Sequence, residues 1–467
     1  MAAGSCYLVV SDLHLCDVED HTDGWKSYKS SKFLFDEDFR ELLKKARDDA
    51  GDAPLTLILN GDIVDFDLVT AVPEKPPWRV DMSEHARGLD ATEPKSVWKL
   101  GRVLDCHPVF VEALVDHLAA GHRIVYIMGN HDREFHFPAV RQTFMDLLRV
   151  RLEARGAALA DGAVRFEPWF FHAKGEIFAE HGQQYDAYTS FFRLLSPTVR
   201  FPLGAEQLAI PMGNLSNRYL MSRMGFFNPH ASDYILNFFS YVVHWLKFYA
   251  LSKRSLVLTW LVGSFVVVWK LVKVRPLLLL KPADLRARLR KVADSTGIAP
   301  ETVGAIYALQ RPPIITRFYR LVREFWIDRL LIAAFMTAGT VTLALVPIPL
   351  WIKLMVPLST FPLLYFIYEW AAQGESIFTI ERRFPNVARA IAALLPVRVV
   401  TFGHTHAPRL IPILKNAVFV DTGTWAPITQ KRRPDRLAPG FRNYLWVSFG
   451  EGEPVVRFGS WYAGSRT

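Results

Sequence analysis

The sequence predicts an α/β sandwich interrupted by a large helical insertion, and two observations lead to this prediction. Short apolar runs rich in β-branched residues alternate with helical patterns over residues 1–185, and runs of the same kind return after residue 396. Between these parts, residues 186–396 contain long apolar runs and many basic side chains. We therefore expect one domain formed by residues 1–185 and 397–467, with residues 186–396 inserted into it.

Eight apolar runs are the expected strands of this domain. They are Tyr7–Val10, Leu55–Leu59, Arg123–Met128, Glu176–Glu180, Arg398–Phe402, Ala417–Asp421, Tyr444–Phe449 and Val455–Phe458. Helical patterns around Phe33–Ala50 and Val109–Ala120 separate the first three runs. Strands that alternate with helices form buried sheets, and functional loops lie at the carboxyl ends of their strands.

The cysteines and the N-terminal residues indicate the cellular compartment. The three cysteines, Cys6, Cys16 and Cys106, show no metal-type spacing, and their odd number favours a reducing compartment over a disulfide framework. Residues Met1–Ser5 carry no basic and apolar leader, so we expect no cleaved signal peptide.

Basic residues are concentrated in the insertion. The net charge of the chain is +9, and residues 247–329 alone contain 16 Lys and Arg against 5 Asp and Glu. A basic region beside apolar runs indicates contact with anionic membrane lipid. We do not expect nucleic acid as a partner, because no recognised nucleic-acid-binding motif accompanies the charge.

The apolar runs of the insertion predict membrane association. Leu330–Ile352 is an uncharged run of 23 residues, long enough to cross a hydrocarbon layer of about 30 Å. Leu354–Tyr368, Leu256–Trp269 and Tyr234–Leu246 are shorter, and each by itself also fits a core helix of a soluble domain.

Candidate metal ligands lie on both sides of the insertion, in Asp12-Leu13-His14 before it and in Gly403-His404-Thr405-His406 after it. Both flanks must therefore lie on the same side of a membrane, and the number of crossings must be even. A hairpin of Leu330–Ile352 with Leu354–Tyr368 meets this condition if Lys353 lies at the turn. Pairing Leu256–Val274 with the first run also meets it, but it would put the basic loop on the far side, against the positive-inside tendency. Helices that lie flat in the interface are the remaining alternative. We expect the domain formed by residues 1–185 and 397–467 to face the cytoplasm.

Five short motifs with potential metal ligands follow the predicted strands. They are Asp12-Leu13-His14, Gly61-Asp62 with Asp65, Gly129-Asn130-His131-Asp132, Glu180-His181-Gly182 and Gly403-His404-Thr405-His406. Most of them, taken alone, fit ordinary loops, and the last is the most specific. Together, in this order, they indicate a two-metal phosphoesterase site.

The motifs provide the ligands that such chemistry needs. Two divalent ions about 3.5–4 Å apart lower the pKa of a water molecule and polarise phosphoryl oxygens. One carboxylate must bridge them, and Asp62 suits this role because Gly61 lets the backbone approach closely. Oxygen and nitrogen ligands without thiolate favour two ions of manganese, with iron or zinc as alternatives.

This motif set resembles the signature of the calcineurin-like metallophosphoesterase superfamily, over roughly residues 5–185 and 397–460. The resemblance implies a double β-sandwich flanked by helices and a two-metal centre. It also implies two overlapping sets of ligands. One metal would be held by Asp12, His14, Asp62 and His406, and the other by Asp62, Asn130, His181 and His404.

The residues after Asn130 are the expected catalytic group. The resemblance implies that His131 assists the departing oxygen, although a structural role beside Asn130 is an alternative. Asp132 and Asp65 are expected to orient His131 and the loop backbone. Arg133 is expected to contact a substrate phosphate or to form a surface salt bridge.

Ser11-Asp12-Leu13-His14-Leu15 also resembles the bacterial branch that hydrolyses UDP-2,3-diacylglucosamine, although that branch usually has arginine where this chain has His131. We therefore expect a phosphoesterase or pyrophosphatase acting on a phosphorylated or nucleotide-linked membrane lipid. Two alternatives remain open: a metallophosphoesterase on a soluble phosphodiester with the insertion as anchor only, and a non-catalytic membrane scaffold.

Overall fold

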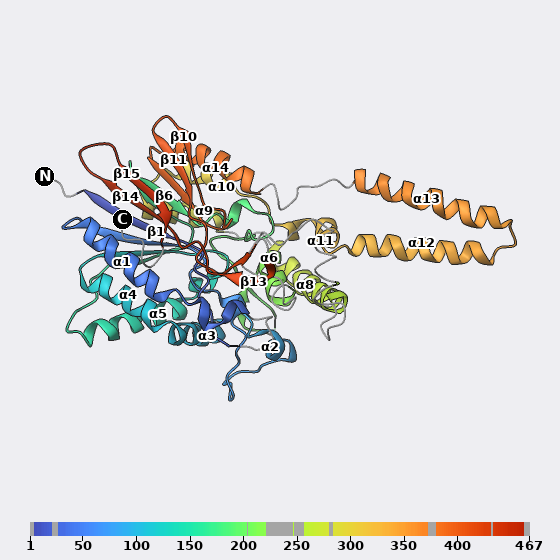
Figure 1. Ribbon diagram of the computed structural model, residues 1–467, viewed down its shortest axis with the longest axis horizontal. Coiled ribbons are helices and arrows are strands. Elements are labelled where there is room, and N and C mark those ends of the chain that lie inside the picture. Colours follow the sequence, from blue (N-terminus) through green and yellow to red (C-terminus); the bar gives the residue numbers. More distant parts are fainter. Residues whose placement is uncertain are drawn as a thin grey trace.

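Two β-sheets lie face to face with helices on their outer sides, which confirms the predicted αββα fold class (Figure 1). The computed structural model describes residues 4–20, 27–202, 204–220, 246, 256–279, 284–371, 380–430 and 433–461. The core between the sheets is formed by alternate residues of both, for example Val9 and Ile58 from one and Ala179 and Val399 from the other.

The first sheet has six strands in the order β15-β14-β1-β2-β3-β4. Strands β1 to β4 are parallel, and β14 pairs with β1 antiparallel, so the end of the chain returns to the first strand. The strands are β1 (Ser5–Val10), β2 (Leu55–Asn60), β3 (Arg123–Ile127), β4 (Val164–Glu167), β14 (Asn443–Phe449) and β15 (Val455–Ser460).

The second sheet has five strands in the order β10-β11-β9-β6-β5. Here β6, β9 and β11 are parallel, and the pairing of β6 with β9 joins the parts of the chain before and after the insertion. The strands are β5 (Phe170–Ala173), β6 (Ile177–Glu180), β9 (Val399–Phe402), β10 (Arg409–Leu414) and β11 (Ala417–Asp421). Two further ribbons pair β7 (Thr198–Arg200) with β8 (Glu206–Leu208) and β12 (Ile428–Gln430) with β13 (Arg433–Ala438).

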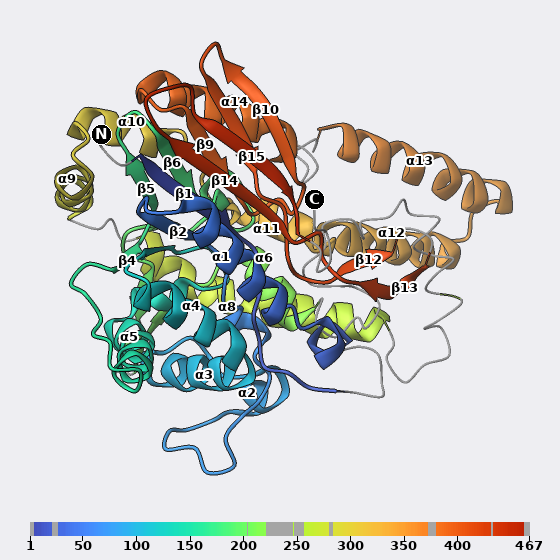
Figure 2. The same cartoon turned by 60° about the vertical axis from the view of Figure 1, so that its left-hand side comes forward.

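Helices cover the outer face of each sheet (Figure 2). On the first sheet these are α1 (Asp36–Ala50), α3 (Glu93–Cys106), α4 (Pro108–Ala119) and α5 (Pro138–Glu153), and the short α2 (Met82–Arg87) precedes α3. In α1 the buried residues Phe39, Leu42, Leu43 and Ala46 recur at the spacing of one helix face.

Part of the predicted insertion belongs to the outer layer of the second sheet. Helices α9 (Leu285–Thr296), α10 (Pro300–Ala308) and α14 (Ile380–Leu394) share a core with β6, β9 and β11. The boundaries at residues 185 and 396 stay a prediction, but these helices are structurally part of the sandwich.

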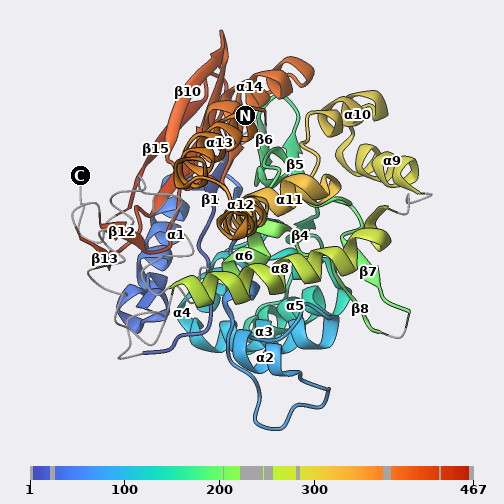
Figure 3. The same ribbon diagram turned by 90° about the vertical axis from the view of Figure 1, so that its right-hand side faces the viewer.

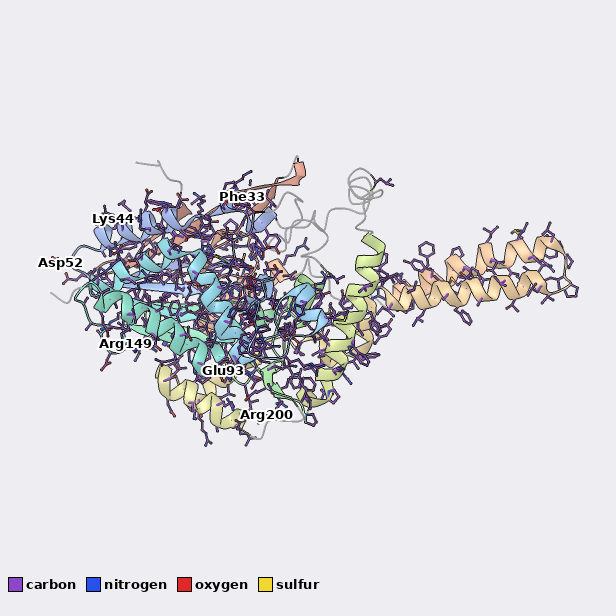
Figure 4. The ribbon with its side chains drawn as sticks, turned by 90° about the horizontal axis from the view of Figure 1, so that it is seen from below. Phe33, Lys44, Asp52, Glu93, Arg149 and Arg200 are labelled. Carbon is purple, nitrogen blue, oxygen red and sulfur yellow. The ribbon has the colours of Figure 1, made fainter. Side chains whose placement is uncertain are left out.

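The rest of the insertion comprises α6 (Met212–Tyr219), α8 (Leu256–Leu279), α11 (Phe318–Glu324), α12 (Ile327–Leu345) and α13 (Leu350–Ala371). Helices α12 and α13 form an antiparallel hairpin that projects away from the sandwich (Figures 1 and 4). Both are long and apolar enough to cross a membrane. In the apolar 18-residue stretch of each helix, only 6% of the residues of α12 and 0% of those of α13 are buried.

The hairpin corrects one detail of the sequence prediction. The run Leu330–Ile352 is not one helix, because α12 ends at Leu345 and α13 begins at Leu350. Pro347 and Pro349 lie between them, and proline lacks the N–H that would continue a helix. Lys353 lies in the first turn of α13 rather than at the turn itself, and its amine donates to the Ala344 carbonyl. The run Tyr234–Leu246 lies outside the described residues except for its last residue.

Candidate metal centre

The five motifs converge at the carboxyl ends of parallel strands from both sheets. In the first sheet, motifs follow β1, β2 and β3, and in the second sheet they follow β6 and β9. Because these strand ends meet at one edge of the sandwich, residues almost 400 positions apart become neighbours. Three groups of possible ligands result: Asp12, His14 and His406; Asp62, His181 and His404; and His14, Asp65 and His131.

The first group places three ligand atoms around one point. His406 Nε2 lies 3.1 Å from Asp12 Oδ1 and 3.1 Å from His14 Nε2. His14 Nε2 is itself 3.9 Å from Asp12 Oδ1. Two imidazole nitrogens directed at each other beside a buried carboxylate are the arrangement expected of side chains that share a cation.

The second group lies next to the first, and Asp62 lies between them. Asp62 Oδ2 is 3.1 Å from His181 Nε2 and 4.0 Å from His14 Nε2. His181 Nε2 is buried and makes no hydrogen bond despite this short distance. A nitrogen near a carboxylate oxygen without hydrogen-bond geometry is consistent with two ligands of one ion.

Asn130 is a further candidate ligand, and the backbone N–H of the next residue, His131, donates to Asp62 Oδ1 of the second group. Asn130 Oδ1 is buried and has no hydrogen-bond partner, whereas its Nδ2 donates to Asn214 Oδ1 at 3.2 Å. Asn214 in turn donates to Asp67 Oδ2 at 2.8 Å and to the Asn130 carbonyl. An unpaired buried oxygen is costly unless something binds it, so this oxygen fits a metal ligand.

The remaining ring nitrogens are held by neighbouring oxygens. His14 Nδ1 lies 2.9 Å from Asp65 Oδ2, and His181 Nδ1 lies 2.9 Å from the Asn60 carbonyl. Such contacts fix the tautomer and leave Nε2 of each ring with its lone pair towards the centre. His404 is held through Nε2 by Asp186 at 3.2 Å and Thr189 at 3.1 Å, which leaves Nδ1 as its ligand atom.

Three glycines allow these side chains to pack against the backbone. A Cβ at Gly61 would lie 2.5 Å from the His181 ring, and one at Gly129 would lie 2.2 Å from Asp62 Oδ1. A Cβ at Gly403 would lie 2.5 Å from Asp12 Oδ2. Any larger residue at these positions would displace a candidate ligand, which explains the glycine in three of the motifs.

Backbone strain is concentrated in the same place. Of the seven non-glycine residues with positive φ in the described chain, five are candidate ligands. They are Asp12 (53°), His14 (50°), Asp62 (53°), His404 (72°) and His406 (57°). Each such conformation costs about 1–3 kcal/mol and persists where the surrounding structure over-determines it, as is common at functional sites.

The buried carboxylates of the centre favour positive charge beside them. Burial by itself lowers the pKa of His181, but the carboxylates of Asp62 and Asp12 outweigh burial and raise it to about 10. Burial raises the pKa of Asp62, but the imidazoles of His181 and His131 hold that pKa well below its usual range. Divalent cations would meet this demand in place of protons.

His131 lies beside the two groups. Its Nδ1 is 3.1 Å from Asp65 Oδ2 and 3.5 Å from Asp67 Oδ2, and its backbone N–H donates to Asp62 Oδ1 at 2.7 Å. Burial lowers the pKa of His131, but the carboxylates of Asp65 and Asp62 outweigh it and hold the pKa well above its usual range.

Asp132 supports the loop backbone. Its carboxylate accepts hydrogen bonds from the Gly129 and Ile63 N–H groups and from the Tyr126 hydroxyl. Asp65 and Asp67, rather than Asp132, are the carboxylates that contact His131. Asp132 therefore fixes the loop that carries Asn130 and His131, which is a positioning role.

Arg133 requires a correction. We expected a contact with substrate phosphate or a surface salt bridge, but its side chain is 1% exposed. The guanidinium donates to the carbonyls of Pro168 and Leu194 and lies 5.3 Å from the centroid of the Phe191 ring. Arg133 begins a short helical turn, and its hydrogen bonds tie this turn to Pro168 and Leu194.

Several residues that support the candidate ligands lie outside the five motifs. Asp186, Thr189 and Asn214 orient His404 and Asn130, although they lie beyond the last motif of the first part. Asp67 follows the Gly61-Asp62 motif, but nothing in its neighbours indicates a contact with His131. Only the folded chain brings these polar groups to the ligands.

The residues therefore fit two divalent cations, because Asp62 of the second group lies 4.0 Å from His14 of the first group and the buried Asn130 amide oxygen has no hydrogen-bond partner. Residues 7–210 match the sequence model of a family described as calcineurin-like phosphoesterase. None of the curated proteins compared with the chain matches it.

Proposed function

Because the chain contains a calcineurin-like phosphoesterase domain, the domain of a hydrolase that acts on phosphate esters, we propose that it hydrolyses a phosphate ester or pyrophosphate bond of a membrane lipid. The observation that carries this proposal is the joint presence of the ligand groups around Asp62 and an exposed apolar hairpin. Manganese is the metal that we favour, with iron or zinc as alternatives.

The roles of the residues follow from their positions. Two divalent ions bound here would supply an acidic water and Lewis-acid contacts to the phosphoryl group. His131 faces Asp65 through Nδ1 at 3.1 Å, so Nε2 is the nitrogen that remains to give a proton to the leaving oxygen. Asp65 holds both His14 and His131, and Asn214 holds the Asn130 amide. These contacts place the ligands before substrate binds.

The hairpin supports a membrane location for the substrate. Helices of 19 and 22 residues extend about 28 and 33 Å at 1.5 Å per residue, close to the thickness of a hydrocarbon layer. Charged side chains gather at the base of the hairpin, where Glu369 pairs with Arg329 at 2.8 Å and Arg323 at 3.0 Å. We propose that the hairpin enters an anionic bilayer and that the catalytic domain faces the cytoplasm, in line with the basic insertion and the positive-inside tendency.

Hydrolysis by the purified protein in nanodiscs tests the function. We expect manganese-dependent turnover of a nucleotide-linked diacyl lipid and slower turnover of bis-p-nitrophenyl phosphate. His404→Ala should abolish both activities, whereas His85→Ala, at an exposed histidine on α2, should leave them unchanged. Full activity of His404→Ala would refute the assignment of the centre. Turnover of the soluble diester alone would refute the lipid substrate and favour the hairpin as a simple anchor.

A further inference from the structure

A second apolar surface lies on α8, separate from the hairpin. One face of α8 is buried, where Val267 and Leu271 pack in a cluster that includes Leu215 and Tyr219 of α6. The opposite face exposes an apolar stripe formed by Val262, Phe265, Trp269 and Val272. Their spacing of three to four residues puts them along one side of the helix.

Residues Leu256–Trp269 of α8 carry no charged side chain, and a helix that is apolar on all sides is normally buried on all sides. In the described chain, protein covers the inner face of α8, yet Phe265 is 68% exposed and Val262 is 57% exposed. Exposed stripes of this kind mark a surface that contacts a partner or a membrane. None of the residues that the structure describes covers the outer face of α8, and this face therefore needs another apolar environment.

The position of α8 identifies that environment. Figure 1 shows α6 between α8 and the sheets, so the exposed face of α8 points away from the sandwich, in the direction of the hairpin. Figure 3 looks along the hairpin and shows α8 running across the view beneath α12. A bilayer that the hairpin enters would therefore meet α8 along its side.

We propose that α8 is an interfacial helix that lies in the surface of the same bilayer and sets the depth of the metal centre. This inference rests on the membrane association proposed above. Lys273 Nζ lies 4.8 Å from the centroid of the Trp269 ring at the edge of the stripe, a pair suited to headgroup depth. The excess of basic residues in 247–329 matches anionic headgroups.

The contact between α8 and α6 connects this helix to the centre. A Cβ at Gly263 of α8 would lie 2.4 Å from Leu220 Cδ2, so the two segments are in close contact. Asn214 on α6 in turn holds the amide of Asn130. The centre is therefore one helix layer from the proposed bilayer surface, which favours a substrate whose phosphate lies in the headgroup region.

Site-directed spin labelling of the full chain in phosphatidylcholine and phosphatidylglycerol vesicles tests the inference. Labels are placed by Phe265→Cys on α8, Leu358→Cys on the hairpin and Val150→Cys on α5, where the native side chains are 68%, 69% and 61% exposed. The parent protein carries Cys106→Ser, because Cys106 is partly exposed and would react with the label. Cys6 and Cys16 are buried and are kept. Collision rates with oxygen and with a water-soluble nickel complex report depth.

We expect the label at 358 in the hydrocarbon, the label at 265 at headgroup depth and the label at 150 in water. Hydrocarbon depth at 358 with full water access at 265 would overturn the role of α8 and leave the hairpin anchor intact. Water access at all three positions would contradict membrane association itself. Strong dipolar broadening between labels at 265 would show that a second copy covers the stripe, which also overturns the proposal.

Discussion

Gly129→Ala is the substitution that tests the packing of the centre most sharply. The added Cβ would lie 2.2 Å from Asp62 Oδ1 and 2.6 Å from the Asp62 backbone nitrogen. Ordinary contacts begin at 3.4 Å, so Asp62 or the Asn130 loop must move by about 1 Å. The φ of Gly129 is not in the left-handed region, so alanine is allowed there and the contact alone causes the effect.

A displacement of about 1 Å in a catalytic group costs about 100-fold in rate, which corresponds to about 2.7 kcal/mol of transition-state stabilisation. Overpacking at this point should also lower the free energy of unfolding by about 1–3 kcal/mol. We expect kcat/KM for bis-p-nitrophenyl phosphate to fall about 100-fold, with weaker manganese binding in a calorimetric titration.

Gly101→Ala is the matched control. Gly101 lies within α3 with nothing within 4 Å of its added Cβ, so alanine there should stabilise the helix by about 1 kcal/mol and leave activity unchanged. Activity and manganese affinity of Gly129→Ala within about threefold of the parent would contradict this reasoning, because a displaced bridging ligand should cause a larger change. The close approach of Gly129 to Asp62 would then not matter for function.

Three further substitutions test other parts of the account. Asn214→Leu should weaken manganese binding about 10–100-fold by releasing the Asn130 amide, and an unchanged calorimetric titration would show that Asn214 only packs α6. Asp65→Asn, which alters the contacts to His14 and His131, should lower kcat about 10–100-fold with little loss of thermal stability; unchanged kcat would contradict its positioning role. Burial lowers the pKa of His117 to about 3, so below pH 6.5 the unfolded chain binds the proton first and stability falls as pH decreases. The free energy of unfolding, measured with urea, should fall between pH 7.5 and pH 5.5 by about 1.4 kcal/mol less in His117→Gln than in the parent protein. An equal fall in both proteins would show that His117 is not the source.

The strands that carry the motifs were predictable because each is a short apolar run that ends at a polar ligand. Seven of the eight predicted runs differ from the observed strand by one or two residues at an end, and Ala417–Asp421 is the same in both. Strands β4 and β5 were not expected, because each has only four residues and β4 includes the charged residues Arg165 and Glu167.

Long-range packing is what the sequence could not provide. The motifs indicate which residues could bind metal, but they give no sign that Asn214 holds Asn130 or that Asp186 holds His404. Arg133 looked like a surface or substrate residue because arginine is seldom fully buried. Its burial depends on the carbonyl groups of Pro168 and Leu194, which lie 35 and 61 residues further along the chain.

The most direct test of the two-metal centre is a crystal structure of the manganese-loaded protein with anomalous diffraction data. The account predicts two peaks about 3.5–4 Å apart. Asp62 should lie between them, with the His14 and His406 group on one side and the His181 and His404 group on the other. A single peak, or peaks away from Asp62, would contradict it.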